Sequence, residues 1–176
     1  TLTETQQQSL SQLSTVIEQK TGVQLATVII PQMGENWTIE EYTNQLFESW
    51  GIGQKEHDNG LLLLVTLKEK MMRIEVGYGL EGILPDGKAG AIRDQFILPY
   101  FKEGNFQKGL ISGHIALANT IASYYNLKLT EADLQPHTRR YASRNSTHSS
   151  PISDILLLLI IAITTTTTTT TVMIHS

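Results

Sequence analysis

The sequence predicts an α/β domain with a small mixed β-sheet, and three observations lead to this prediction. Two apolar stretches, 23–30 and 61–66, have the composition of buried strands, and a helix-patterned segment over 38–50 separates them. This strand–helix–strand order favours a parallel pair joined by a right-handed crossover. A third stretch, 71–76, alternates in polarity and follows the second after a short polar link. We therefore expect those two strands to form an antiparallel hairpin.

The composition is that of a folded protein and excludes several classes of function. The chain has 176 residues, 40% of them hydrophobic and 17% charged, which is enough for one domain with a core. It contains no cysteine, so a disulfide framework, a cysteine zinc site and a thiol nucleophile are excluded. The net charge of −4, without a basic cluster in the expected domain, argues against nucleic-acid binding.

Capping signals mark the ends of the first two expected helices. Thr3 with Gln6 forms a capping box, and Thr38 with Glu41 forms another. Apolar residues recur at helical spacing after each box. The two helices should end at the following glycines, Gly22 and Gly51.

A third helix is expected over 86–98, after the hairpin. Its pattern places Ile92, Phe96 and Ile97 on the inward face, and Pro99 is compatible with its end.

The last expected helix begins with Asn105 as its cap and keeps its apolar repeat to Tyr124. His114 lies among these apolar positions, so we expect it to pack within the helical layer rather than to bind a ligand. The packed domain should end near Leu129, which gives a domain over 1–129.

Three acidic residues flank the predicted hairpin. Asp58 precedes its first strand, whereas Glu81 and Asp86 follow its second. The two ends of an antiparallel hairpin are neighbours, so these side chains could converge at one edge of the sheet. Oxygen ligands without cysteine or a close histidine pair suit a hard cation, Ca²⁺ or Mg²⁺. The three residues are therefore candidate metal ligands.

Each candidate also has a structural interpretation. Asp58, within Asp-Asn-Gly, is a good turn residue. Asp86, after a proline and before a helix, has the position of an N-cap. Glu81 stands among glycines with no helix to cap, which favours a functional role. On the strand between them, Arg73 and Glu75 share one face and are expected either to be solvated or to pair with each other.

No catalytic motif is recognisable. The chain has no Ser-His-Asp order, no P-loop and no dinucleotide-binding glycine fingerprint. His57 borders the acidic turn and could assist chemistry, although a histidine in a loop usually has no such role.

The C-terminal part changes character. Residues 130–151 have the composition of a polar linker, and 152–174 combine an apolar run, 155–163, with the threonines of 164–171. A spanning helix needs about 20 mainly apolar residues, and the segment reaches that length only with the threonines. We expect it to enter a membrane; the alternative is a disordered tail or the end of a corrupted reading frame. The arginines before it would place the domain in the cytoplasm by the positive-inside rule.

Several motifs resemble those of the TPM domain family. They are Trp50-Gly51-Ile52-Gly53, Asp58-Asn59-Gly60 before leucines, and Arg73-Ile74-Glu75-Val76-Gly77-Tyr78-Gly79-Leu80-Glu81-Gly82 followed by Pro85-Asp86. The resemblance runs from about Thr1 to Leu127. The family includes thylakoid-lumen phosphatase-like proteins, photosystem II repair proteins, and bacterial exported proteins with a membrane segment after the domain.

The resemblance implies a three-layer α/β/α sandwich with helices on both faces of the sheet. It also implies export through a signal peptide and a divalent-metal site in acidic loops, at positions matching Asp58, Glu81 and Asp86. Bacterial members often end in a glycine-rich tail, whereas this chain carries threonines. The family further implies a domain outside the cytoplasm. We favour this location because a cleaved signal can override weak flanking charges.

These observations together predict a Ca²⁺- or Mg²⁺-binding TPM domain tethered to the cell membrane on its extracytoplasmic, periplasmic side. It would act as a non-catalytic accessory factor in the assembly or repair of membrane complexes. The alternative is a metal-dependent acid phosphatase acting on phosphomonoesters, in which the cation would polarise phosphate and activate water. The lack of a convincing nucleophile or general acid favours the accessory role.

Overall fold

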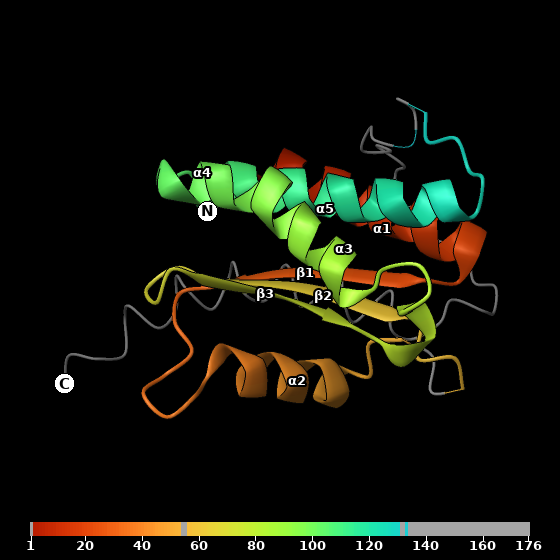
Figure 1. Ribbon diagram of the computed structural model, residues 1–176. Helices are drawn as coiled ribbons and strands as arrows, with labels where there is room; N and C mark the ends of the chain where they lie inside the picture. The colour runs from red at the N-terminus through yellow and green to blue at the C-terminus, as the bar shows by residue number, and fades with distance from the viewer. Residues whose placement is uncertain (1, 54–55, 131–132, 134–176) are drawn as a thin grey trace, which may run out of the picture. The chain divides into compact units, whose positions relative to one another are not determined.

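The computed structural model describes residues 2–53, 56–130 and 133 (Figure 1). The chain divides into two units, Thr1–Gln135 and Pro136–Ser176, and every described residue belongs to the first. The helices are α1 (Glu4–Thr21), α2 (Ile39–Trp50), α3 (Asp86–Ile92), α4 (Leu98–Lys102) and α5 (Phe106–Tyr124), with a 3₁₀ turn η1 (Tyr78–Leu80) and a π-helical turn η2 (Arg93–Ile97). The strands are β1 (Gln24–Ile30), β2 (Gly60–Thr66) and β3 (Met71–Val76).

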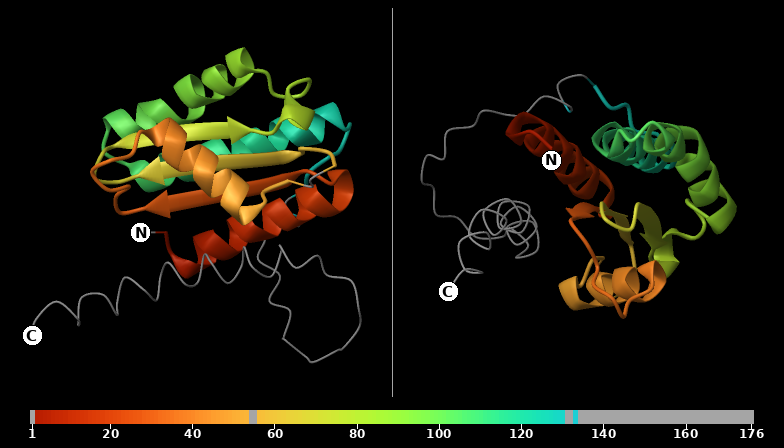
Figure 2. Two further views of the ribbon diagram at one scale, coloured as in Figure 1. Left: turned by 90° about the horizontal axis from the view of Figure 1, so that it is seen from below. Right: turned by 90° about the vertical axis from the view of Figure 1, so that its left-hand side faces the viewer.

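The three strands form one mixed sheet in the order β1-β2-β3. β1 runs parallel to β2, with Leu25 opposite Leu61, and β3 runs antiparallel to it, with Val76 opposite Leu61. Helix α2 covers one face of the sheet, and α1, α3, α4 and α5 lie on the other (Figures 1 and 2). The predicted α/β/α sandwich, with its parallel unit and its hairpin, is confirmed.

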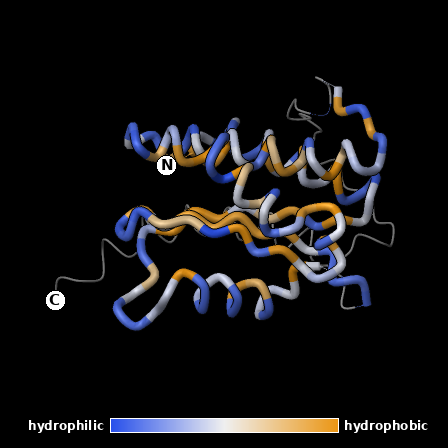
Figure 3. The backbone as a smooth tube through the Cα atoms, viewed as in Figure 1, coloured by the Kyte–Doolittle hydropathy of each residue, from blue (hydrophilic) through white to orange (hydrophobic). Residues whose placement is uncertain are grey.

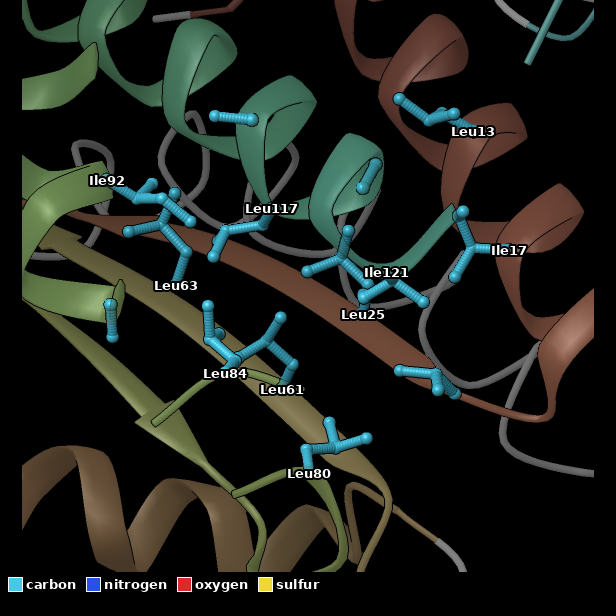
Figure 4. Packing of buried hydrophobic residues seen from close by; sticks show 14 of the residues in the cluster. Leu13, Ile17, Leu25, Leu61, Leu63, Leu80, Leu84, Ile92, Leu117 and Ile121 are labelled. Carbon is cyan, nitrogen blue, oxygen red and sulfur yellow. The ribbon is translucent and has the colours of Figure 1, made fainter. Parts of the chain in front are cut away.

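β2 lies at the centre of the fold and is buried on both faces. The side chains of Leu61 to Val65 are all 0% exposed, which explains why this strand has no polar alternation. Leu61, Leu63 and Val65 belong to the main core beneath α1 and α5, as Figure 4 shows for the first two. In Figure 3 the strands at the centre of the fold are mostly hydrophobic, whereas the helices on either side alternate between hydrophobic and hydrophilic residues.

The predicted capping boxes are present at both helix starts. The hydroxyl oxygen of Thr3 accepts from the Gln6 N–H, and that of Thr38 accepts from the Glu41 N–H, at 3.2 and 3.1 Å. Both helices end at a glycine in the left-handed region, Gly22 with φ 76° and Gly51 with φ 61°.

β3 places its two charged residues on the α2 side of the sheet. The Arg73 Nε lies 2.8 Å from Glu75 Oε2, as expected, and its Nη1 also lies 3.6 Å from Glu40 Oε1 on α2. The alternate residues Met72, Ile74 and Val76 pack against the main core. The strand therefore divides its charged and apolar residues between the two faces.

The helix after the hairpin differs from the prediction. It does not end near Leu98 but continues through η2 and α4 to Lys102. In η2 the Leu98 N–H donates to the Arg93 carbonyl, five residues back, so one wide turn precedes Pro99 and the proline ring is accommodated. The extra residue also changes which side chains face the core. Ile92 and Ile97 are buried as expected, but Phe96, which was expected to face inward, is 41% exposed.

The expected domain boundary, linker and membrane segment fall mostly beyond the described residues. Leu127 and Leu129 pack against the core. Of the expected linker over 130–151, only Thr130 and Asp133 are described, and the segment 152–174 lies outside the described residues. Within residues 2–53, 56–130 and 133, no helix is long and apolar enough to cross a bilayer.

His114 of α5 is buried against β1, as its apolar surroundings predicted. It is 1% exposed, and its Nδ1 lies 2.8 Å from the Thr27 hydroxyl oxygen. Its Nε2 has no hydrogen-bond partner of good geometry among the described residues. Burial lowers the pKa of His114 to about 4, and a weak contact with the Leu10 backbone opposes that shift.

This depressed pKa predicts a loss of stability in mild acid. The unfolded chain protonates His114 below about pH 6.5, whereas the folded protein resists until about pH 4. The contribution of buried, neutral His114 to the free energy of unfolding is therefore fully present above pH 6.5. It is lost as the pH falls toward 4, by up to about 3 kcal/mol. Urea unfolding between pH 7 and 4.5 should show a shallower pH dependence for His114→Gln than for the wild type. The exposed His57→Gln is the control, and identical profiles for wild type and His114→Gln would contradict the prediction.

Candidate functional site

The turn before β2 and the turn after β3 meet at one end of the sheet. Asp58 adopts a left-handed conformation, with φ 45°, and its carbonyl accepts from the Gly79 N–H at 3.1 Å. Next to this bond, the Gly77 N–H donates to the Gly60 carbonyl at 2.8 Å. The predicted convergence of the hairpin ends is therefore present in the backbone.

Two glycines make this close approach possible. A Cβ atom on Gly77 would collide with the Asp58 carbonyl oxygen, and one on Gly79 would collide with the His57 carbonyl oxygen. Both obstacles are backbone atoms and cannot move aside as a flexible side chain could. The glycines of the Gly-Tyr-Gly motif are thus required by the distance between the two turns.

Two polar residues hold the turn before β2 from the other side. The Asn59 side-chain amide donates to the Gly22 carbonyl at 2.7 Å, and the Gln24 N–H donates to the Asn59 carbonyl at 3.0 Å. The Gln24 side-chain oxygen in turn accepts from the Gly53 N–H at 2.7 Å. This role of Gln24 was not predicted from the sequence, although a polar residue at the start of an apolar strand is a signal for it.

The three candidate carboxylates are all exposed at this end of the molecule. Asp58 and Glu81 lie on the two turns that meet, and Asp86 is the first residue of α3. The N-cap of α3 is Pro85, so the interpretation of Asp86 as a cap is wrong, although its charge is favourable at a helix N-terminus. None of the three carboxylates forms an ion pair or side-chain hydrogen bond with another described residue.

The three carboxylates are suitable ligands for a hard cation, but they do not lie close together. In the described part of the chain, no three acidic or histidine side chains lie close enough to hold one metal ion. The oxygen donors are of the kind that Ca²⁺ and Mg²⁺ prefer. No described lysine or arginine forms an ion pair with them. What the fold brings together is the backbone of the two turns, with the carboxylates free to solvent.

Comparison with known proteins gives a consistent result. The TPM domain family matches residues 1–120 of the chain. The solution NMR structure of the N-terminal domain of a protein from P. gingivalis is similar, with 30% identity and a TM-score of 0.66, over 79% of this chain and 83% of that one.

The NMR structure of the BA42 protein from the psychrophilic bacterium Bizionia argentinensis is similar in fold, with 20% identity and a TM-score of 0.59. The similarity covers 70% of this chain and 83% of that one. No curated protein matches the chain.

The contact between the turns predicts that Gly79→Ala destabilises the protein by about 2 kcal/mol or more, because a backbone carbonyl blocks the new methyl group. Gly82→Ala is the matched control, since nothing lies within 4 Å of a Cβ there. Urea unfolding of the two variants measures the difference. Equal stability of Gly79→Ala and Gly82→Ala would show that the two turns are not packed as described.

Proposed function

The chain belongs to the TPM domain family, and from this premise we propose that it is a divalent-cation-binding, membrane-tethered accessory domain that acts outside the cytoplasm. In this proposal Asp58, Glu81 and Asp86 supply the carboxylate ligands for Ca²⁺, with Mg²⁺ as the weaker alternative. The domain assists the assembly or repair of a membrane protein complex and catalyses no reaction of its own.

The observation that carries the cation site is the meeting of the two acidic turns. The hydrogen bond from Gly79 to the Asp58 carbonyl holds the backbones of Asp58 and Glu81 on the same end of the sheet. A bound cation would need only side-chain rotation and small loop movements to gather the carboxylates, because the backbone is already in place. Preorganisation of this kind reduces the entropic cost of binding.

Charge supports the same proposal. The three exposed carboxylates have no ion-pair partner among the described residues, and they lie on a protein whose net charge is −4. Negative charges that repel one another in the free protein are brought together favourably by a divalent cation. Ca²⁺ accepts variable geometry and suits ligands on exposed turns better than Mg²⁺, which requires a near-ideal octahedron.

The membrane tether rests on the sequence of the C-terminal part. The apolar run 155–163 follows a polar linker, and the family includes exported members with a membrane segment after the domain. A tether of this type would keep the domain close to the bilayer. The family supports an extracytoplasmic location against the arginine count of the linker.

The cation proposal predicts that Ca²⁺ stabilises the full chain against unfolding. A ligand at 100 times its dissociation constant adds about 2.7 kcal/mol, so the melting midpoint should rise clearly in Ca²⁺ relative to chelator. The rise should be lost in Asp58→Asn and Glu81→Gln, and it should persist in Glu48→Gln, an exposed acid on α2. An unchanged midpoint in millimolar Ca²⁺ would reject the site.

A non-catalytic role predicts hydrolysis of an aryl phosphate close to the uncatalysed rate. Purified protein is assayed with Ca²⁺ and with Mg²⁺ at acidic and neutral pH, beside Asp58→Asn and Glu81→Gln. Robust turnover that disappears in both variants would make the protein an enzyme and would favour the acid phosphatase alternative.

The tether predicts membrane retention that is weak and sensitive to single changes. The run 155–163 rises only about 13 Å, under half of the ~30 Å hydrocarbon core, so the threonines must supply the remaining length. Leu158→Arg should release the protein, because an arginine in the span costs roughly 3 kcal/mol. Cells that express the protein with an export signal are fractionated and the membranes washed with carbonate.

Ser149→Arg, outside the apolar run, is the control for added charge and should stay in the membrane fraction. Complete release of the wild type by carbonate would reject a span. Resistance of the domain to protease added to spheroplasts would place it in the cytoplasm instead.

A further inference from the structure

A groove is lined by residues of α3, η2, α4 and α5. These helices lie on the face of the sheet opposite α2 (Figure 1). The volume of the groove is about 600 Å³. The apolar part of the lining includes Ile92, Phe96, Ile111 and Ile115. The groove is formed by different residues from those of the acidic turns and is independent of the cation proposal.

The π-helical turn η2 places an aromatic side chain in this groove. In a regular helix continuing from Ile92, Phe96 would face the core and Ile97 would turn away from it. The extra residue of the π turn reverses this, so Phe96 is 41% exposed while Ile97 is 0% exposed. Exposure of an aromatic ring to water is unfavourable, and π turns inside helices are frequent at functional sites. The irregular turn thus provides an apolar anchor that the packing of the core does not need.

The groove is positively charged although the protein is acidic. Among the described residues that line it, Lys88 and Lys108 are the only charged ones, whereas the whole chain has a net charge of −4. Lys88 Nζ donates to the Ile83 carbonyl at 3.2 Å, and Lys108 Nζ lies 4.7 Å from the centre of the Tyr100 ring. Both partners are neutral, so neither lysine has a carboxylate to balance it among the described residues.

The two lysines stand at opposite ends of the groove. Lys88 lies in the first turn of α3, and Lys108 contacts Tyr100 in α4, about 18 Å further along the helix at ~1.5 Å per residue. Small polar residues of α5, among them Ser112, Asn119 and Ser123, line the groove between these ends. This pattern is apolar in the middle, polar along one border and positive at both ends.

We propose that this groove binds an amphipathic helix of a partner protein, with apolar residues along one face and acidic residues at both ends. A helix of about 12 residues spans the distance between the lysines and fills the apolar centre at i, i+3, i+4 and i+7 positions. A single-headed lipid would use one lysine and leave the other unmatched. A helix with acids at both ends matches both lysines.

The test uses the full 176-residue chain and a designed, fluorescein-labelled peptide of about 14 residues, with leucines at helical spacing and two glutamates at each end. Fluorescence anisotropy measures its dissociation constant. Lys88→Gln with Lys108→Gln, and separately Phe96→Ser, should each weaken binding about tenfold. Amide NMR shifts caused by the peptide should cluster at Phe96 and Ile115.

Matched controls separate the groove from other exposed residues. Lys128→Gln with Lys20→Gln, and Tyr78→Ser, change exposed lysines and an exposed aromatic residue outside the groove and should leave binding unchanged. A peptide with lysines in place of the glutamates should bind at least tenfold more weakly.

Three results would overturn the proposal. The first is no saturable binding of the glutamate peptide up to about 1 mM. The second is that the wild type binds the glutamate and lysine peptides equally, or that the groove variants bind the glutamate peptide as tightly as the wild type does. The third is that the peptide does not bind but phosphatidylglycerol vesicles do, in a way that depends on Phe96 and the two lysines. That result would assign the groove to a lipid surface.

Discussion

Burial of β2 on both faces is the constraint on which the rest of the structure depends. Leu61 to Val65 are completely inaccessible, and each such side chain contributes roughly 2 kcal/mol when it leaves water. A strand without a polar face must be paired on both edges and covered on both faces. β1 and β3 form hydrogen bonds with its two edges. Helices α1, α5 and the helix from α3 to α4 cover one face of the sheet, and α2 covers the other.

The candidate cation site is a consequence of this central strand. β3 pairs with β2 in an antiparallel register, so the chain leaving β3 passes the turn that enters β2. Gly77 and Gly79 allow the two turns to touch, and Asn59 and Gln24 hold the entering turn against β1. The packed core therefore positions the backbone of the acidic loops, while the carboxylates themselves remain at the surface.

In the groove between the helices, core packing also determines which side chain is exposed at the surface. Ile92 and Ile97 are both needed in the core, but their spacing of five residues does not fit a regular helix. The π turn between them reconciles the spacing, turns Phe96 outward and accommodates Pro99 within a helix that continues to Lys102. A local irregularity required by packing thus creates the exposed aromatic residue to which we assign a partner.

The sequence by itself determined the order of strands and helices except over 93–102, including the start of α3 at Asp86 and the last helix capped by Asn105. Capping residues, terminal glycines and apolar periodicity are local signals. The sequence also placed Asp58 and Glu81 at neighbouring ends of the hairpin, because pairing of consecutive strands follows from a short link. Only the tertiary structure decided the path of residues 93–102, the exposure of Phe96 and the anchoring role of Gln24. These features depend on contacts between segments far apart in the chain, where core packing outweighs the local tendency of a proline to end a helix.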